Sequence, residues 1–194
     1  AQEDSMLQAD ILIRLNKTID MKLGITPFEY QRSQTGLMRW GGLDANVLIR
    51  GSLDQVLMNI DFAPVHITSQ TQSMLSLDNV RFHSKTRLED NAPWIGEQTL
   101  SMPSFYLRDE RGQSILIKDL TVRSISDVSN ALAEFLVSAS VEDIQVSDRS
   151  IGRSNLQIMI EKMQAAPMVQ FAELAAELDQ NPQAPVDQEA LIWT

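Results

Sequence analysis

Residues Ile11–Leu23 read ILIRLNKTIDMKL, and apolar side chains occupy nearly every second position. The odd positions hold an apolar residue everywhere except Lys17, and the even positions after Leu12 are polar. Successive side chains of a β-strand point to opposite faces, so this period of two predicts a strand with one apolar and one polar face. A continuous strand of this length would span roughly 43 Å, about the diameter of a compact chain of this size. We therefore expect an elongated or strongly twisted sheet.

Further extended segments follow, separated by turn residues. Candidate strands lie at Val47–Ile49, Gln55–Thr68, Met74–Phe82, Gln98–Leu107 and Ser114–Val122. Thr26-Pro27 and Gly41-Gly42 predict turns between short strands, and Asp109–Gly112 predicts a turn between longer ones. Pro64 indicates an edge position or a bulge, because proline has no amide hydrogen to donate.

Two later segments decide the fold class. Asn130–Val141 fits a helix through Leu132, Phe135 and Leu136, but the alternation from Ala131 to Val141 is longer, so we predict a strand. After Pro167, apolar residues follow at helical spacing, at Phe171, Leu174, Ala175 and Leu178, which predicts a helix that ends before Asn181-Pro182. The expected fold is β-dominated α+β: a long, twisted, mostly antiparallel sheet with this C-terminal helix on part of one face. Residues 1–180 would form one domain, and residues 181–194 a linker or extended tail.

An internal repeat covers about residues 75–102 and 139–158. Ser76–Phe82 resembles Ser140–Val146, and each is followed by an Ile-Gly block, at Ile95-Gly96 and Ile151-Gly152. A partial third copy begins at Ile117. We expect each unit to be a strand, a turn carrying Ile-Gly, and a returning strand, so that stacked hairpins build the sheet. The glycines suit positive φ or close backbone approach, and the shared Asn or Asp at positions 79, 119 and 143 suits a bulge or a strand entry.

These spaced strands and Ile-Gly turns, over about residues 72–180, resemble the YdgA-like family of bacterial envelope proteins of unknown function. The resemblance implies a periplasmic protein, or one anchored in the inner membrane and facing the periplasm, built from repeated β units. The family supplies no catalytic residues to carry over. This sequence departs from the larger members because it is shorter and lacks their N-terminal membrane helix, so it is either an excised domain or a small relative.

Composition narrows the functional classes. The formal net charge of −10 opposes binding to nucleic acid or to anionic bilayers, and no apolar run approaches the roughly 18 residues that span a membrane. The absence of cysteine excludes thiolate catalysis, disulfides and cysteine-bound zinc, and is compatible with an oxidising compartment or the cytoplasm. The start at Ala1-Gln2-Glu3-Asp4 fits the mature end of an exported protein or a domain boundary.

No residue set predicts catalysis, a cofactor or a metal. A metal site would need His66 or His83 to converge with a carboxylate such as Asp61 or Asp78, and the spacing does not demand it. The acid pairs Glu89/Asp90, Asp109/Glu110 and Glu142/Asp143 are interpreted as surface charges. Nucleophile-elbow and phosphate-loop motifs are absent.

The remaining signal is a surplus of soft or wide side chains in or beside the expected strands: Met38, Trp40, Met58, Met74, Trp94, Met102 and Met159. Core packing is the ordinary interpretation, and a groove for an acyl chain or a partner's apolar segment is the functional one. We expect a non-enzymatic envelope domain that binds a partner protein or an amphiphile, or supports an assembly. The alternative is a hydrolase whose carboxylate or serine site assembles only in three dimensions. The oligomeric state is left open.

Overall fold

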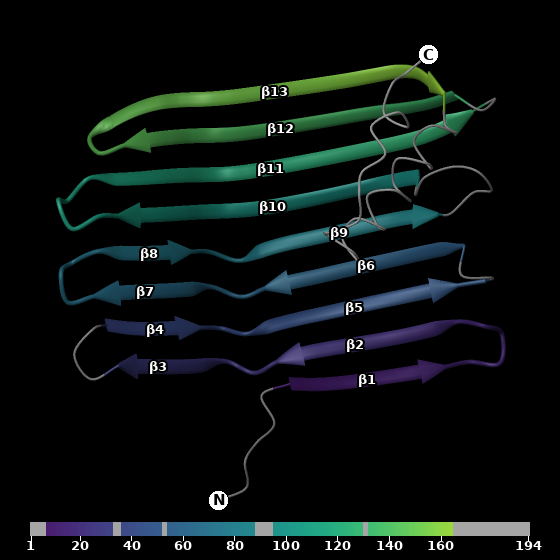
Figure 1. Ribbon diagram of the computed structural model, residues 1–194, viewed down its shortest axis with the longest axis horizontal. Helices are drawn as coiled ribbons and strands as arrows, with labels where there is room; N and C mark the ends of the chain where they lie inside the picture. The colour runs from purple at the N-terminus through teal and green to yellow at the C-terminus, as the bar shows by residue number, and fades with distance from the viewer. Residues whose placement is uncertain (1–6, 33–35, 52–53, 88–94, 130–131, 165–194) are drawn as a thin grey trace, which may run out of the picture.

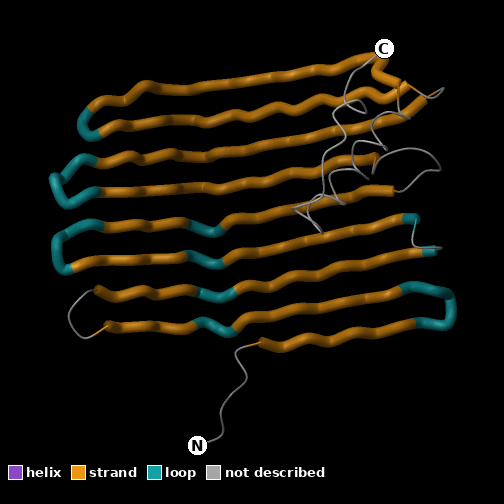
Figure 2. Tube along the Cα trace, viewed as in Figure 1, coloured by secondary structure: helices purple, strands orange, loops and turns teal. Residues whose placement is uncertain are grey.

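The computed structural model describes residues 7–32, 36–51, 54–87, 95–129 and 132–164, which form one sheet of 13 strands in a single layer (Figure 1). Every strand pair is antiparallel, and the described residues contain no helix (Figure 2). The strands are β1 (Leu7–Ile13), β2 (Ile19–Ile25), β3 (Phe28–Arg32), β4 (Gly36–Trp40), β5 (Leu43–Arg50), β6 (Gln55–Phe62), β7 (Val65–Ser69), β8 (Met74–Leu77), β9 (Val80–Arg87), β10 (Ile95–Arg108), β11 (Ser114–Ser129), β12 (Leu132–Val146) and β13 (Arg149–Gln164).

The chain runs back and forth across the sheet as a meander. β2 continues into β3, β4 into β5, β6 into β7 and β8 into β9, and in each case two residues separate the two strands. β10 to β13 each run the full extent of the sheet along the strand direction, whereas β1 pairs only with β2 (Figure 1). Each pass therefore pairs with the passes before and after it in sequence, so the sheet needs no crossover connection.

The interruptions align in a line across the sheet, which we call the seam. The registers place them side by side: Thr26-Pro27, Gly41-Gly42, Ala63-Pro64, Asp78-Asn79, Pro103, Asp119 and Glu142-Asp143. Hydrogen bonds continue through it, because Gly41 N donates to Pro64 O at 2.9 Å and Ala63 N donates to Gly42 O at 3.0 Å. The seam is thus a row of bulge-like irregularities within continuous passes.

The seam keeps the apolar side chains on one face along each pass. Phe62 and Val65 are three residues apart, so strict alternation would put them on opposite faces. Val65 is the register partner of Trp40, and the Trp40 ring lies 5.2 Å from the Phe62 ring. Phe62 and Val65 therefore lie on the same face of the sheet, because the irregular residues Ala63-Pro64 between them shift the alternation by one position.

The hairpin of β1 and β2 corrects the expectation of one long strand from Ile11 to Leu23. The chain reverses between Ile13 and Ile19, where Lys17 has a φ of 62° and Arg14 N donates to Thr18 O at 2.9 Å. Ile11 pairs with Met21, and Ile13 with Ile19. Odd-numbered residues pair with odd-numbered residues across this turn. The apolar and polar residues therefore stay on the same two faces after the chain reverses.

The dipeptides Thr26-Pro27 and Gly41-Gly42 are also not turns between strands, as we expected, but seam positions where the chain keeps its direction. Pro64 occupies an irregularity between interior strands, which confirms the bulge and not the edge alternative. The expected Ile-Gly turns are wrong as well: Gly96 lies inside β10 and Gly152 inside β13. Their expected conformations hold, since φ is 141° at Gly96 and 88° at Gly152.

Other expectations are confirmed. Leu132–Val146 is strand β12, so alternation was the correct guide there. Asp109 closes the turn before β11, with its amide donating to Gln113 O at 2.9 Å. Asp119 has a φ of 50°, and the register of β12 shifts between Val141 and Ile144, as expected for bulges at the repeated acidic positions. The expected C-terminal helix lies outside the described residues.

Two neighbouring substitutions test the assignment of faces. Leu100→Asp should lower the free energy of unfolding by about 2 kcal/mol or more, because it places a charge among half-buried apolar side chains. Thr99→Asp should change it by less than about 0.5 kcal/mol, because that side chain lies between His83 and Arg123 on the opposite face. Urea unfolding of both variants measures the difference, and equal effects would show that the faces are assigned wrongly.

Candidate functional site

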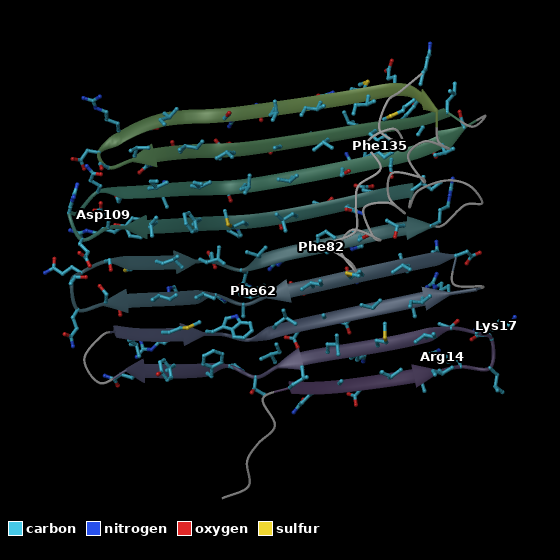
Figure 3. All side chains as sticks on the ribbon, in the orientation of Figure 1. Arg14, Lys17, Phe62, Phe82, Asp109 and Phe135 are labelled. Carbon is cyan, nitrogen blue, oxygen red and sulfur yellow. The ribbon has the colours of Figure 1, made fainter. Side chains whose placement is uncertain are left out.

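One face of the sheet carries an unbroken row of apolar side chains. Register partners share a face, so the row can be followed from strand to strand. We call it the apolar ladder; its members are Ala9, Leu23, Ala45, Ile60, Phe82, Leu100, Val122, Ala139 and Leu156. Phe82, near its centre, is labelled in Figure 3. With adjacent strands about 4.8 Å apart, the ladder is about 38 Å long.

The chain neighbours of the apolar-ladder residues make the opposite face polar. This second row, the polar ladder, also crosses from β1 to β13 and consists of Asp10, Lys22, Asn46, Asn59, His83, Thr99, Arg123, Ser138 and Gln157. Each member is the chain neighbour of one apolar-ladder residue. The sheet is therefore amphipathic across its whole width.

The apolar character continues on the other side of the seam. There the register aligns Phe28, Trp40, Val65, Leu77, Phe105, Ile117 and Ile144 in one row, and Tyr30, Met38, Ile67, Leu75, Leu107, Ile115 and Val146 in the next. These two rows and the apolar ladder form what we call the apolar face.

The described strands leave this face open. All of them belong to the one sheet, so none lies over it. Ile67 is 39% exposed and Leu156 60% exposed. Buried apolar side chains are few among the described residues, and Val65 beside the seam is one of them. The apolar face thus carries exposed apolar side chains near its edges, whereas Ala45 and Ser84 on the same face are buried.

A polar patch interrupts the apolar face beside the ladder. Ser84, Gln98 and Ser124 are register partners on β9, β10 and β11, and they occupy the row next to Phe82, Leu100 and Val122. Ser84 is buried and Gln98 is exposed. Hydroxyl and amide groups therefore border the apolar ladder near its middle. Sequence reasoning missed this patch, although the loss of apolar residues at these three alternating positions was a visible signal.

An aromatic cluster packs at the seam. Trp40 meets Phe28 edge to face with 5.5 Å between ring centroids, and it also contacts Phe62. The indole nitrogen of Trp40 is buried and has no hydrogen-bond partner within the described part of the chain. These rings fix the apolar face where the strands are irregular.

Ion pairs stabilise the polar face. Arg123 donates to Glu97 at 2.7 Å, and this hydrogen bond lowers the pKa of the Glu97 carboxyl below its usual value. Hydrogen bonds from Ser150 and Gln145 lower the pKa of Asp143 in the same way. Glu142 accepts from Arg153 at 2.6 Å and raises the pKa of that guanidinium. The carboxyl groups of Glu97 and Asp143 therefore stay ionised at neutral pH, so neither is held in the protonated form that a general acid needs.

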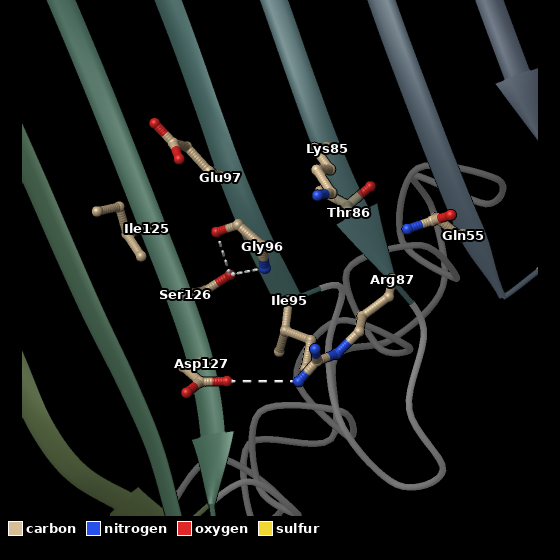
Figure 4. A pocket seen from close by; sticks show the side chains of 10 residues that line it. All are labelled: Gln55, Lys85, Thr86, Arg87, Ile95, Gly96, Glu97, Ile125, Ser126 and Asp127. Atoms are coloured by element: carbon tan, nitrogen blue, oxygen red, sulfur yellow. Dashed lines mark hydrogen bonds and ion pairs between the residues drawn. The ribbon is translucent and has the colours of Figure 1, made fainter.

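A cavity of about 410 Å³ lies at one end of β9, β10 and β11 (Figure 4). Its charged lining residues are Lys85, Arg87, Glu97 and Asp127, two of each sign, and Arg87 lies 3.6 Å from Asp127. Gly96 forms part of the wall, and its amide donates to Ser126 Oγ at 3.1 Å. The balanced charges give this cavity no clear preference for an anion or a cation.

The two histidines lie apart on the polar face. His66 Nδ1 is 2.8 Å from Ser76 Oγ, and His83 Nδ1 is 2.6 Å from Asn59 Oδ1. Asp61 lies instead beside Arg81, and Asp78 accepts a hydrogen bond from the amide of Asn79. A serine and a histidine thus meet, but no described carboxylate is hydrogen-bonded to the His66 ring to orient it as a triad requires.

The remaining candidates from the sequence are two acid pairs and the soft or wide side chains. Asp109 accepts from turn amides and Glu110 from Thr71, whereas Glu89/Asp90 and Trp94 lie outside the described residues. The methionines divide between the faces. Met38, Met58 and Met102 lie on the apolar face, and Met74 and Met159 lie on the polar one.

Within the described ranges, no three acidic or histidine side chains gather as metal ligands would. No helix there has the length and hydropathy needed to cross a membrane.

A family model described as a bacterial protein of unknown function (DUF945) matches residues 1–192. No curated protein and no solved structure matches the chain. The YdgA-like resemblance stays a prediction.

A glycine substitution tests the geometry of the cavity wall. A Cβ on Gly96 would lie 2.1 Å from the backbone oxygen of Lys85, and φ there is 141°, so Gly96→Ala should cost about 2 kcal/mol or more of unfolding free energy. Gly24→Ala is the control, because its Cβ would meet nothing closer than 3.8 Å. Thermal unfolding of the two variants checks this, and a tolerated Gly96→Ala would contradict the close approach of β9 and β10.

Proposed function

We propose that this chain, which belongs to the bacterial family of unknown function DUF945, is a non-enzymatic cell-envelope domain that binds amphiphiles on its apolar face. The apolar ladder would hold the hydrocarbon chain, and the polar patch of Ser84, Gln98 and Ser124 would hydrogen-bond the headgroup. The observation that carries the proposal is the apolar ladder itself, which crosses from β1 to β13 without one polar residue.

The dimensions of the ladder suit a hydrocarbon chain. Its length of about 38 Å exceeds the roughly 15 Å that one leaflet of a bilayer's hydrocarbon core occupies. Its side chains offer no hydrogen-bond donors or acceptors, so contacts with an occupant are non-directional, as an acyl chain requires. Burying aliphatic surface against these half-exposed side chains gains about 25 cal/mol per Å².

The polar patch favours an amphiphile over a pure hydrocarbon. Gln98 presents an amide, flanked on both sides by the hydroxyls of Ser84 and Ser124. Binding sites for small apolar molecules combine such a few polar groups with apolar walls, and the polar groups fix the orientation. The net charge of −10 works against attachment to an anionic bilayer, so the proposed ligand is a single amphiphile and not a membrane surface.

The envelope location is the second part of the proposal. It is supported by the resemblance of the strand and Ile-Gly pattern to the YdgA-like envelope proteins. The absence of cysteine is compatible with an oxidising compartment, since a free thiol there forms unwanted disulfides. The hydrolase alternative has weaker support, because the contact of Ser76 with His66 lies on the open polar face and not in the cavity of Figure 4.

Titration with a fluorescent fatty acid, cis-parinaric acid, tests the proposal. The wild-type protein should bind it saturably, and Val137→Asp should weaken binding about tenfold or more, because it places a carboxylate next to Ser124 on the apolar face. Ser138→Asp, one residue along and on the polar ladder, should leave the affinity unchanged. Absence of saturable binding, or equal loss in both variants, would refute the proposal, and binding to whole vesicles only would indicate a membrane-surface role instead.

A further inference from the structure

The last strand of the sheet exposes a long edge. In the part of the chain that the structure describes, β13 is hydrogen-bonded to β12 alone. Proteins usually protect an edge strand by shortness, proline, glycine-linked bulges or charges. β13 has 16 residues, and its segment Asn155–Ile160, NLQIMI, carries no charge, proline or glycine. Ile158 is 50% exposed and Met159 54% exposed, so exposed apolar side chains lie on both faces of this edge.

We propose that β13 pairs antiparallel with β13 of a second copy of this chain, about a twofold axis through Gln157. In this register Leu156 lies opposite Ile158 of the second copy, and Arg153 lies opposite its Glu161. The twofold axis repeats each contact, so two pairs of opposite charge flank an uncharged centre. Both charged side chains are exposed, and Arg153 also bonds Glu142 in its own chain.

Charge favours this register over the two in-phase registers whose axis is shifted by one residue. Moving the axis by one residue, to Leu156 or to Ile158, would place Arg153 opposite Met159 or Met163. Each of those registers leaves the charges without a partner across the edge. Opposite-charge pairs on adjacent strands stabilise an antiparallel pairing, and like-charge pairs destabilise it.

The pairing also continues the apolar face. Leu156 is the last member of the apolar ladder, and Ile158 is the register partner of Val137. Across the proposed edge, these two positions would meet, so the apolar rows of one copy would run into those of the other. The paired segment from Arg153 to Glu161 would form roughly eight to ten backbone hydrogen bonds. The opposite edge is less suited, because it is divided between β1, which has only 7 residues and contains Asp10 at its centre, and β3, which has only 5 residues and contains Glu29 and Arg32. This inference does not depend on the proposed binding of amphiphiles.

Two charge reversals of the chain of residues 1–194 test the pairing. Wild-type protein should dimerise between about 1 and 100 µM in sedimentation velocity. R153E alone and E161R alone each place like charges opposite one another twice, so each should weaken the dimer about tenfold or more. An equimolar mixture of the two variants restores opposite charges at both contacts. Native mass spectrometry should therefore detect a mixed dimer that exceeds either homodimer.

Lys22→Glu is the matched control, because it makes the same charge change on an exposed residue of an interior strand and should leave the dimer unchanged. A monomeric wild-type protein would overturn the proposal. So would dimers that ignore both reversals, which would point to stacking of apolar faces or to the β1 edge, and so would a mixture that forms no mixed dimer.

Discussion

The structure depends on one constraint, the register between neighbouring passes of the meander. Because side chains alternate with a period of two, a slip of one residue between any two strands would move a polar row onto the apolar face. The register holds Ala9 in line with Leu156 through every intervening strand. The seam serves the same constraint, because its irregular residues shift the alternation by one position and so keep the apolar side chains on one face on both sides of it.

The sequence predicted the two faces because alternation is a local property. Within Ile11–Leu23 it correctly separated apolar from polar residues, and at Leu132–Val146 it correctly indicated a strand. It could not reveal the reversal between Ile13 and Ile19, because partners of equal parity keep the pattern intact through the turn. The seam was visible only as repeated Asn or Asp residues and as Gly and Pro pairs, which ordinarily mark turns.

The candidate site could not be predicted from the local alternation of apolar and polar residues. Neither a row of cross-strand partners nor the patch at Ser84, Gln98 and Ser124 exists until the register is known, because their members lie far apart in sequence. The search for soft side chains also mixed the faces, placing Met159 with Met58 although they lie on opposite sides. The proposed function depends on the aligned sheet and not on any local motif, because the residues of the candidate site come together only in the register.

The most direct test of this account is disulfide formation in a chain that has no cysteine of its own. Thr99 and Arg123 are register partners on β10 and β11, so cysteines at these two positions should oxidise to an intramolecular disulfide. Cysteines at Thr99 and Val122 face opposite sides and should remain reduced under the same conditions. The reverse result, with the second pair cross-linked and the first not, would contradict the register on which both faces depend.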